Sequence, residues 1–441
     1  MLLDERLKKE FSKRVHAAEI SESLDGKHVN LFGWVHEVRD LGKLVFIVLR
    51  DVSGDCQIVF RRDGLDGKVA QELDGLSNES VVFVHGYVAR QPKSRRGVEV
   101  VGETIEVLSK AASRLEYDPT EKVPASIDVR LKHRILDLRR QKIKSIFILG
   151  SAVLKVLREF FYENGYIEVR TPKIIASATE GGAELFEVKY FDRTAYLAQS
   201  PQLYKEQLTT VFEKVFEIGP FFRAEESHTR RHVSEFTSVD IEQAFADMED
   251  VMSVLEKAVV HVYERLLNEH QRELNVLGVS LKVPKTPFTR LSYDEAVKIL
   301  ENDGVKVEWG EDFSTPHLRA LAKHFHGYYF ITGFPTETKP FYIQPSATNP
   351  SISESFDLMY QWLELASGGT RVHQQSVLRD RLVQKGLDPK QFEDHLKVFE
   401  YGMPVHAGWG LGFERLMMVL TRITNIREVI LFPRDRFRLT P

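Results

Sequence analysis

The chain of 441 residues contains a single cysteine, Cys56. One cysteine excludes an intrachain disulfide framework and any zinc site built from CxxC pairs, and it is compatible with a reducing compartment. No run of about 18 apolar residues occurs, so the sequence predicts no membrane-spanning helix. The N-terminal segment is charged from its fourth residue and has no apolar stretch, so we expect no secretory signal and predict a cytoplasmic location.

The sequence also lacks an excess of positive charge and the common phosphate-binding loops. The formal net charge is −4 at pH 7, so contact with a nucleic acid would depend on local basic patches. There is no GxxxxGK[ST] segment, and no GxGxxG segment follows a predicted strand and opens a helix. A nucleotide site would therefore have to be built from arginines and acidic residues on a sheet.

Two domains and a connection can be recognised by their different patterns. Residues 28–108 contain five short β-branched runs separated by turn signals. This pattern predicts a small closed barrel, with a generic β-domain as the alternative. Residues 111–134 contain two prolines and little periodic apolar sequence, so they are predicted to be a hinge after a first domain of residues 1–110.

Residues 135–441 are predicted to form an α+β domain. The apolar spacing predicts a helix over 144–165 that ends at Gly165, and a second helix over 250–270. Apolar runs between these helices predict the strands of an antiparallel sheet. Residues 270–345 show no clear pattern and are expected to be a peripheral insertion.

Three blocks of this domain carry candidate chemistry. The first, Gly165–Pro172, is a helix end, a strand and a proline, and it has no specificity alone. The second, residues 221–242, supplies Arg223 and Glu225 from a strand, Arg230, Arg231 and His232 from a polar loop, and Phe236 from a returning strand. The Arg223 guanidinium suits an α-phosphate and a carboxylate, and the Phe236 ring offers a flat face to a purine.

The alternative interpretation of the second block is a basic hairpin of solvated charges. Its HTRRH segment could also suggest a metal, but two histidines without a third ligand do not make a site. The third block, residues 408–420, joins small residues that permit close backbone approach to Glu414 and Arg415 at the start of a helix. The three blocks in this order and at these separations are far more specific together than singly.

The order of the blocks resembles that of class II aminoacyl-tRNA synthetases, with FRAEE…RRH…EF similar to their second motif and GLGFERL similar to their third. Four more segments resemble the aspartyl- and asparaginyl-tRNA synthetases: TEGGAELF (179–186), AQSPQLYK (198–205), ASGGTR (366–371) and FPRDRFRLTP (432–441). The resemblance covers almost the whole chain, including a barrel similar to their OB-fold anticodon-binding domain. The short length resembles the archaeal branch.

The resemblance implies an aspartate–tRNA ligase. Because aspartate and asparagine are nearly isosteric, charge must separate them. Lys205 and Arg371 are expected to face the side-chain carboxylate of aspartate, as two cations in a dry pocket that would remain uncompensated beside a neutral amide. Ser200 and Gln202 are expected to line this pocket, and Glu180 is expected to take the α-ammonium.

The resemblance also implies ATP and Mg²⁺. Glu364 and Ser367 are expected to hold Mg²⁺ on the ATP phosphates, with Asp357 behind them. The expected ATP contacts are Arg223, Glu225, Arg231, His232, Val233, Phe236, Glu364, Gly412, Glu414 and Arg415, of which Arg223, Glu225 and Arg415 form the catalytic set; Arg223 and Ser367 also border the aspartate. The implied product is aspartyl-adenylate, whose aspartyl group is then transferred to the 3′ end of tRNA-Asp.

In the barrel, the resemblance implies an anticodon site. Phe46 and Gln57 are expected to stack on and hydrogen-bond the central anticodon uracil, with Arg39 nearby. The alternative places Phe46 in the barrel core and Gln57 on the surface as an ordinary amide. His36 favours relaxed specificity, in which tRNA-Asn is also charged with aspartate for later amidation by an amidotransferase, whereas Arg95 is an opposing signal.

Three other functions stay open at this point. An asparaginyl-tRNA synthetase is the first, and Lys205 argues against it. An asparagine-synthesising paralogue is the second, and such paralogues generally lack the barrel. A catalytically silent RNA-binding module is the third, and Arg223, Glu364 and Arg415 argue against it. By resemblance we also expect a homodimer with a two-fold interface near Pro172.

Overall fold

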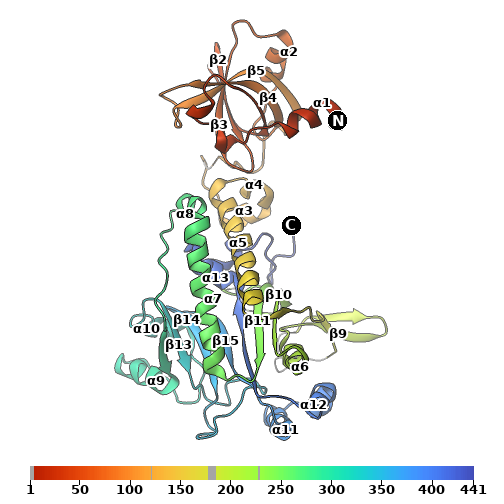
Figure 1. Ribbon diagram of the computed structural model, residues 1–441, viewed down its shortest axis with the longest axis vertical. Helices are drawn as coiled ribbons and strands as arrows, with labels where there is room; N and C mark the ends of the chain where they lie inside the picture. Colours follow the sequence, from red (N-terminus) through yellow and green to blue (C-terminus); the bar gives the residue numbers. More distant parts are fainter. Residues whose placement is uncertain (1–3, 121, 177–184, 227–228) are drawn as a thin grey trace. The chain divides into compact units, whose positions relative to one another are not determined.

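The computed structural model describes residues 4–120, 122–176, 185–226 and 229–441. The chain divides into two units, Met1–Gln141 and Lys142–Pro441 (Figure 1). Each unit has its own hydrophobic clusters. None of the helices in the described ranges combines the length and the apolar character that crossing a bilayer requires.

Five strands of the first unit close into a barrel in the order β1-β2-β3-β5-β4. They are β1 (His28–Asp40), β2 (Leu44–Arg50), β3 (Asp55–Arg61), β4 (Val81–Arg90) and β5 (Val98–Ser109). Strand alternation sends Val45, Ile47 and Leu49 of β2 into the core. Gly102 leaves room for the Phe60 ring, because a Cβ there would lie 2.3 Å from Phe60 Cζ. The predicted closed barrel is confirmed.

Short helices accompany the barrel. They are α1 (Glu5–Ser12), α2 (Gly67–Asp74), α3 (Ile127–Lys132), α4 (Arg134–Asp137), and the 3-10 turns η1 (Ala17–Glu19) and η2 (Glu22–Leu24). One of them, α3, lies in the predicted hinge, and α4 begins at the last residue of the hinge. The buried Asp137 carboxylate is bound by Arg130 at 3.0 Å and by Arg134 at 2.7 Å. Because charges rather than a periodic apolar stripe hold this segment, the sequence pattern predicts no helix there.

The second unit is built on an eight-stranded sheet in the order β12-β13-β14-β15-β16-β11-β10-β6. Its strands are β6 (Ile167–Glu168), β10 (Lys214–Phe222), β11 (Glu235–Ala244), β12 (Thr289–Ser292), β13 (Tyr328–Thr332), β14 (Ser355–Tyr360), β15 (Leu363–Thr370) and β16 (His406–Gly412). The central strands pair antiparallel, as predicted, and only the two edge strands β6 and β12 pair in parallel. The α+β fold class is confirmed.

The other elements of this unit are mostly helices. They are α5 (Gln141–Glu163), α6 (Gln202–Phe212), α7 (Met248–Glu269), α8 (Gln271–Leu277), α9 (Tyr293–Asn302), α10 (Thr315–Leu321), α11 (Gln375–Gln384), α12 (Glu393–Phe399) and α13 (Phe413–Thr421), with 3-10 turns η3 (Pro389–Phe392) and η4 (Ile426–Val429). A small sheet in the order β7-β9-β8 comprises β7 (Ile174–Ile175), β8 (Glu187–Tyr190) and β9 (Arg193–Leu197).

Helices α5 and α7, both predicted, cover one face of the main sheet (Figure 1). The Trp409 indole of β16 donates to Val251 O of α7 at 2.9 Å. The rings of Phe161 in α5 and Phe216 in β10 lie 4.9 Å apart. These contacts place the main core between the two helices and the sheet.

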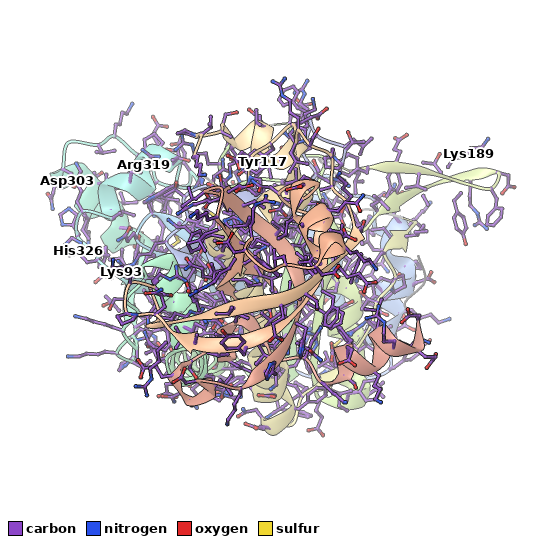
Figure 2. The ribbon with its side chains drawn as sticks, turned by 90° about the horizontal axis from the view of Figure 1, so that it is seen from above. Lys93, Tyr117, Lys189, Asp303, Arg319 and His326 are labelled. Carbon is purple, nitrogen blue, oxygen red and sulfur yellow. The ribbon has the colours of Figure 1, made fainter. Side chains whose placement is uncertain are left out.

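The region predicted as a peripheral insertion adds β12 and β13 to one edge of the main sheet. Helices α9 and α10 pack there around a cluster that includes Leu291, Leu300 and Phe334. Figure 2 shows Asp303 and Arg319 on this lobe, and Lys189 on the β8–β9 hairpin that projects from the other side of the same unit.

Candidate functional site

A cavity of about 430 Å³ opens on the face of the main sheet that α5 and α7 leave uncovered. The pleat of the strands separates the two faces. On β11, Ser238 and Asp240 line the cavity, whereas Val239 and Ile241 are fully buried in the core. On β16, Trp409 points to α7. The cavity and the helical core therefore lie on opposite sides of one sheet.

Two glycines of β16 keep the floor of the cavity open. Gly408 and Gly410 lie opposite Glu242 and Asp240 of β11. A Cβ on Gly408 would lie 2.3 Å from Glu242 Oε2, and one on Gly410 would lie 3.0 Å from Asp240 Oδ1. The small residues that open the third sequence block thus make room for two buried carboxylates.

The cavity brings together the residues predicted for aspartate, ATP and metal, with two exceptions. Those that line it are Ser200, Gln202, Arg223, Glu225, Arg231, His232, Val233, Phe236, Glu364, Ser367, Arg371, Gly412, Glu414 and Arg415, together with Asp357. Lys205 is not among the lining residues that the structure describes. Glu180 lies outside the described residues.

Arg223 and Phe236 lie side by side at the loop end of the β10–β11 hairpin. Phe236 pairs with Phe221 in the ladder, and Arg223 N donates to Ser234 O at 3.0 Å just beyond it. The Arg223 guanidinium carbon lies 5.3 Å from the centre of the Phe236 ring. An aromatic face and a planar cation at this spacing can hold a flat base beside an anionic group.

Acidic and hydroxyl oxygens gather on β14 and β15. Asp357 pairs with Ser367 in the ladder, and Leu365 is the extra residue of a β-bulge, which lets Glu364 and Ser367 both line the cavity. Lys339 Nζ donates to both Asp357 oxygens, at 2.9 and 2.8 Å. Burial, opposed by Lys339, raises the pKa of Asp357 to about 6. Lys339 already binds both oxygens of Asp357. The side-chain oxygens of Glu364 and Ser367 are therefore the ones that fit a hard cation such as Mg²⁺.

Two further cations lie at the same end of the cavity. Arg415 Nη1 donates to Glu364 O at 2.9 Å and lies 3.5 Å from Glu364 Oε1. Arg231 Nη2 donates to Thr315 Oγ1 at 2.6 Å. Burial and the nearby Arg415 lower the pKa of His232, so its imidazole is neutral at pH 7. This end of the cavity is therefore cationic and suits a polyanion.

Lys205 is buried and ion-paired, which overturns the predicted electrostatics of the amino-acid pocket. Lys205 Nζ donates to Asp240 Oδ1 at 2.9 Å and lies 3.4 Å from Glu242 Oε2. Arg371 Nε donates to Glu242 Oε1 at 2.9 Å. Two cations thus face two carboxylates, because a buried ammonium or guanidinium is stable only when it is paired. The predicted pair of uncompensated charges is wrong, and Lys205 supports Asp240 instead of bordering the cavity.

One carboxylate oxygen at the cavity floor lacks a partner. Among the residues that the structure describes, Asp240 Oδ2 is buried and makes no hydrogen bond, whereas Asp240 Oδ1 accepts from Lys205. A buried carboxylate oxygen without a donor is costly, so the position suits an N–H group of a ligand. Arg371 lines the same cavity and can only donate hydrogen bonds. This end of the cavity offers one acceptor and one donor to the same ligand.

In the barrel, three predicted anticodon residues lie on adjacent strands. Arg39 of β1 is opposite Phe46 of β2, and Gln57 of β3 is opposite Val48, two residues along from Phe46. Gln57 Nε2 donates to Glu99 Oε2 at 2.8 Å. Phe46 and Gln57 are half-buried, and the described core cluster of the barrel does not include Phe46. The structure therefore brings Arg39, Phe46 and Gln57 to one surface.

The other two predicted anticodon residues are held by specific partners. His36 is the extra residue of a β-bulge in β1, and its Nδ1 accepts from Arg50 Nη1 at 3.0 Å. Arg50 also binds the buried Glu79 carboxylate at 2.6 Å. Burial opposes ionisation of Glu79, but the neighbouring His36 and the hydrogen bonds from Arg50 and Arg139 lower its pKa to about 2. Arg95 donates to Asp55 Oδ1 at 2.6 Å.

Comparison with known families decides the identity of both units. The family described as tRNA synthetases class II (D, K and N) matches residues 126–436, which is more than half of the chain. The chain belongs to the class II tRNA synthetases. The family described as OB-fold nucleic acid binding domain matches residues 29–108 of this synthetase. The resemblance inferred from the sequence blocks is confirmed, and so is the OB-fold barrel.

Individual relatives cover nearly the whole synthetase. The Aspartate--tRNA(Asp/Asn) ligase of Archaeoglobus fulgidus is 50% identical over 429 residues, which are 97% of this chain and 100% of the relative. The Aspartate--tRNA(Asp) ligase of Pyrococcus abyssi is 47% identical, over 97% of this chain and 99% of the relative. The crystal structure of asparaginyl-tRNA synthetase from Pyrococcus horikoshii complexed with asparaginyl-adenylate has a TM-score of 0.92 at 35% identity, over 97% and 99% of the two chains.

The sequence patterns do not find two residues that line the cavity, Asp240 and Lys339, nor Glu242 beside them. Asp240 and Glu242 are two positions apart in the segment SVDIE, so a strand there places both carboxylates on the same side. This spacing is a signal in the sequence that could have revealed them. Lys339 lies in the region 270–345, where the sequence offers no pattern and hence no signal.

Glu414 gives the synthetase a pH dependence that can be measured. Its buried carboxylate accepts from Thr237 N at 3.0 Å, but burial outweighs this bond and raises its pKa to about 7. The folded state therefore keeps a proton that the unfolded state loses near pH 4.5. Glu414 makes the folded state progressively less stable as the pH rises from about 4.5 to about 7.

We expect Glu414→Gln to gain stability relative to the wild-type protein as the pH is raised from 5 to 8. The variant has no ionisation to suppress, so the difference in the free energy of unfolding should grow by roughly 2–3 kcal/mol across this range. Urea denaturation of both proteins at pH 5, 6.5 and 8 measures it. Parallel pH profiles would contradict this, because they would show that the pKa of Glu414 is the same in the folded and unfolded states.

Proposed function

We propose that this synthetase is an aspartate–tRNA ligase, which activates aspartate with ATP and transfers it to the 3′ end of a tRNA. One observation carries the proposal: Arg371 and Asp240 lie in the same cavity as Arg223, Glu364 and Arg415. An amino acid with an ammonium and a side-chain carboxylate meets both Asp240, an acceptor, and Arg371, a donor. The printed names of the Archaeoglobus and Pyrococcus abyssi relatives support the same amino acid.

The proposed chemistry has two steps. An oxygen of the aspartate α-carboxylate attacks the α-phosphorus of ATP, and the bond to pyrophosphate breaks. The 3′-hydroxyl of the terminal adenosine of tRNA then attacks the carbonyl carbon of the mixed anhydride, and AMP leaves. A carboxylate nucleophile needs no general base, so the protein contributes orientation and charge.

Each side chain of the cationic end has a role in this proposal. Arg223 bridges the α-carboxylate and the α-phosphate, and Phe236 stacks on adenine. Glu225 and the neutral His232 position ATP, while Arg415 neutralises the outer phosphates. Glu364 and Ser367 would hold Mg²⁺, which supplies further charge neutralisation on the phosphates when it is bound.

We propose that the barrel reads the anticodon loop and that its specificity is relaxed. Phe46 supplies a half-buried aromatic face and Gln57 a neighbouring amide, and stacking on a splayed base contributes about 1–3 kcal/mol. His36, on its bulge, supports charging of both tRNA-Asp and tRNA-Asn, as does the printed name of the Archaeoglobus relative. Aspartate on tRNA-Asn would then be amidated by a separate amidotransferase.

Charging of two transcripts tests the proposed function and its specificity. We expect aspartate to be joined to transcripts with GUC and GUU anticodons with kcat/KM values within about tenfold of each other, which corresponds to a discrimination of at most about 1.4 kcal/mol at the one base that differs. A transcript with a GAA anticodon is the negative control. A hundredfold preference for GUC would reject relaxed specificity, and failure to charge either transcript would reject the function.

We also infer a homodimer with an interface near Pro172. The residues on either side of Pro172 are held in place, because Thr171 Oγ1 and Lys173 Nζ both donate to the buried Glu217 carboxylate at 2.7 Å. Sedimentation equilibrium would give twice the chain mass of 50.8 kDa. The predicted cytoplasmic location stays a prediction.

A further inference from the structure

Two histidines and a glutamate lie close together on the surface of the barrel. None of the predicted anticodon residues pairs with them in the strand register. His28 of β1, His85 of β4 and Glu103 of β5 each offer a ligand atom within 4.8 Å of the other two. In the described ranges, no other group of three histidine, cysteine or acidic side chains converges in this way. Neither the family match nor the proposed reaction accounts for this trio.

The strand register explains why these three side chains share one face. Asn30 is directly opposite His85, and His28 precedes Asn30 by two residues, so both point to the His85 side of the sheet. His85 is opposite Thr104 and Gly86 is opposite Gly102. Glu103 is therefore the extra residue of a β-bulge. A bulge re-aims a side chain, and this one leaves Glu103 exposed beside the two histidines.

Each histidine nitrogen lies at the ligand spacing of a tetrahedral metal site from one oxygen of the Glu103 carboxylate, the two histidines from different oxygens. His28 Nε2 lies 3.4 Å from Glu103 Oε1, and His85 Nε2 lies 3.6 Å from Glu103 Oε2. With metal–ligand bonds of about 2.0–2.2 Å, neighbouring ligand atoms of a tetrahedron lie about 3.3–3.6 Å apart. The two imidazole rings are stacked, with centroids 5.5 Å apart and planes inclined by 16°. Both rings thus present an edge to the same carboxylate.

A second layer of hydrogen bonds fixes the tautomer of His85. Asn30 Nδ2 donates to Glu10 Oε2 at 2.6 Å, so Asn30 Oδ1 is the atom that faces His85 Nδ1, at 2.7 Å. His85 Nδ1–H donates to it, so Nε2, which lies 3.6 Å from Glu103 Oε2, is the ring nitrogen that can bind a metal. A metal-binding histidine typically has such a partner on its other nitrogen.

We propose that His28, His85 and Glu103 form a zinc-binding site on the barrel. Two imidazole nitrogens favour zinc and related transition metals over Mg²⁺ and Ca²⁺, which prefer oxygen. The three side chains are 57%, 39% and 42% exposed, so water can complete the fourth position. The ion ties β1, β4 and β5 together and, through Asn30 and Glu10, secures α1. The site is independent of the proposed reaction.

Zinc titration of the full-length protein tests this site. After treatment with a chelator and dialysis, the wild-type protein is titrated with Zn²⁺ against a chromophoric competitor. We expect one tight Zn²⁺ per chain, at least tenfold weaker binding by His85→Ala and Glu103→Gln, and slower hydrogen exchange in β1, β4 and β5 when Zn²⁺ is bound. All three ligands are exposed, so both variants should remain folded, which circular dichroism checks.

Two further variants make the test specific. Asn30→Ala keeps all three ligands but removes the partner of His85 Nδ1, and should weaken zinc binding about 10–100-fold. His324→Ala is the matched control, because His324 forms an exposed pair with Asp303, at 2.9 Å, that has no third ligand; its zinc affinity should equal that of the wild-type protein.

Anomalous diffraction at the zinc edge locates the ion, since zinc can also enter the Glu364 region of the cavity. A peak between His28, His85 and Glu103 supports the proposal. No bound zinc, a peak only in the cavity, or an affinity unchanged in His85→Ala and Glu103→Gln would overturn it.

Discussion

Replacing Arg223 with alanine is expected to lower aspartate-dependent pyrophosphate exchange by about three orders of magnitude. Arg223 is the lining cation that lies beside Phe236, 5.3 Å from its ring, where the proposed α-phosphate and α-carboxylate meet. Its planar fork can donate to both anions at once. The variant should bind ATP within about tenfold of the wild-type affinity, because the contact is needed most when charge develops at phosphorus.

The matched control is Arg379→Ala. Arg379 forms a partly exposed pair with Glu393 at 3.5 Å, and exposed pairs contribute little stability. This variant should retain exchange activity within about twofold. If Arg223→Ala also kept near-normal exchange, the cationic end of the cavity would not be the site of adenylate formation.

Replacing Arg371 with glutamine is expected to have the second largest effect. Arg371 lines the cavity and is also the partner of the buried Glu242 carboxylate at 2.9 Å. The substitution removes the donor for the aspartate side chain and leaves Glu242 with only Lys205, at 3.4 Å. Truncating one partner of a buried charge pair costs about 2–5 kcal/mol, so kcat/KM for aspartate should fall by roughly two to three decades and the free energy of unfolding should drop.

A charge-balanced double variant separates the two consequences. Arg371→Gln with Glu242→Gln leaves no unpaired carboxylate, so the thermal stability lost in the single variant should largely return. Aspartate activation should stay low, because the guanidinium is still absent. If activation returned together with stability, Arg371 would act only as the partner of Glu242, and the proposed contact with the substrate would be wrong.

The architecture could be predicted from the sequence because its signals are local. Five β-branched runs specify the barrel, and the apolar spacing of residues 144–165 and 250–270 specifies α5 and α7. The blocks around Arg223 and Arg415 supply chemistry in an order that few folds share. The main sheet brings these blocks together, and their residues line one cavity.

The electrostatics of the pocket could not be predicted, because it depends on pairs far apart in the chain. Lys205 reaches Asp240, and Arg371 reaches Glu242 across 129 positions. A sequence displays the cations of the AQSPQLYK and ASGGTR segments but not their partners, so the two charges look uncompensated. The segment α4 around Asp137 is missed for a different reason, because nearby charges rather than a periodic apolar stripe hold it.

Excess positive charge does not explain selectivity in this pocket. The side chains of Lys205, Arg371, Asp240 and Glu242 together carry no net charge, so they do not attract an anion through an excess of positive charge. We propose that selectivity for aspartate instead depends on the fixed directions of hydrogen bonds: Arg371 offers only donors, and Asp240 Oδ2, which has no partner among the described residues, offers only an acceptor. Asparagine would turn an amide N–H₂ toward a donor-only group, and a site built around such directions rejects the mismatched ligand strongly.

The most direct test of this claim is amino-acid-dependent pyrophosphate exchange by the wild-type synthetase with aspartate and with asparagine. The account predicts that kcat/KM for aspartate exceeds that for asparagine by at least about a hundredfold. Equal values for the two amino acids, or a preference for asparagine, would contradict it.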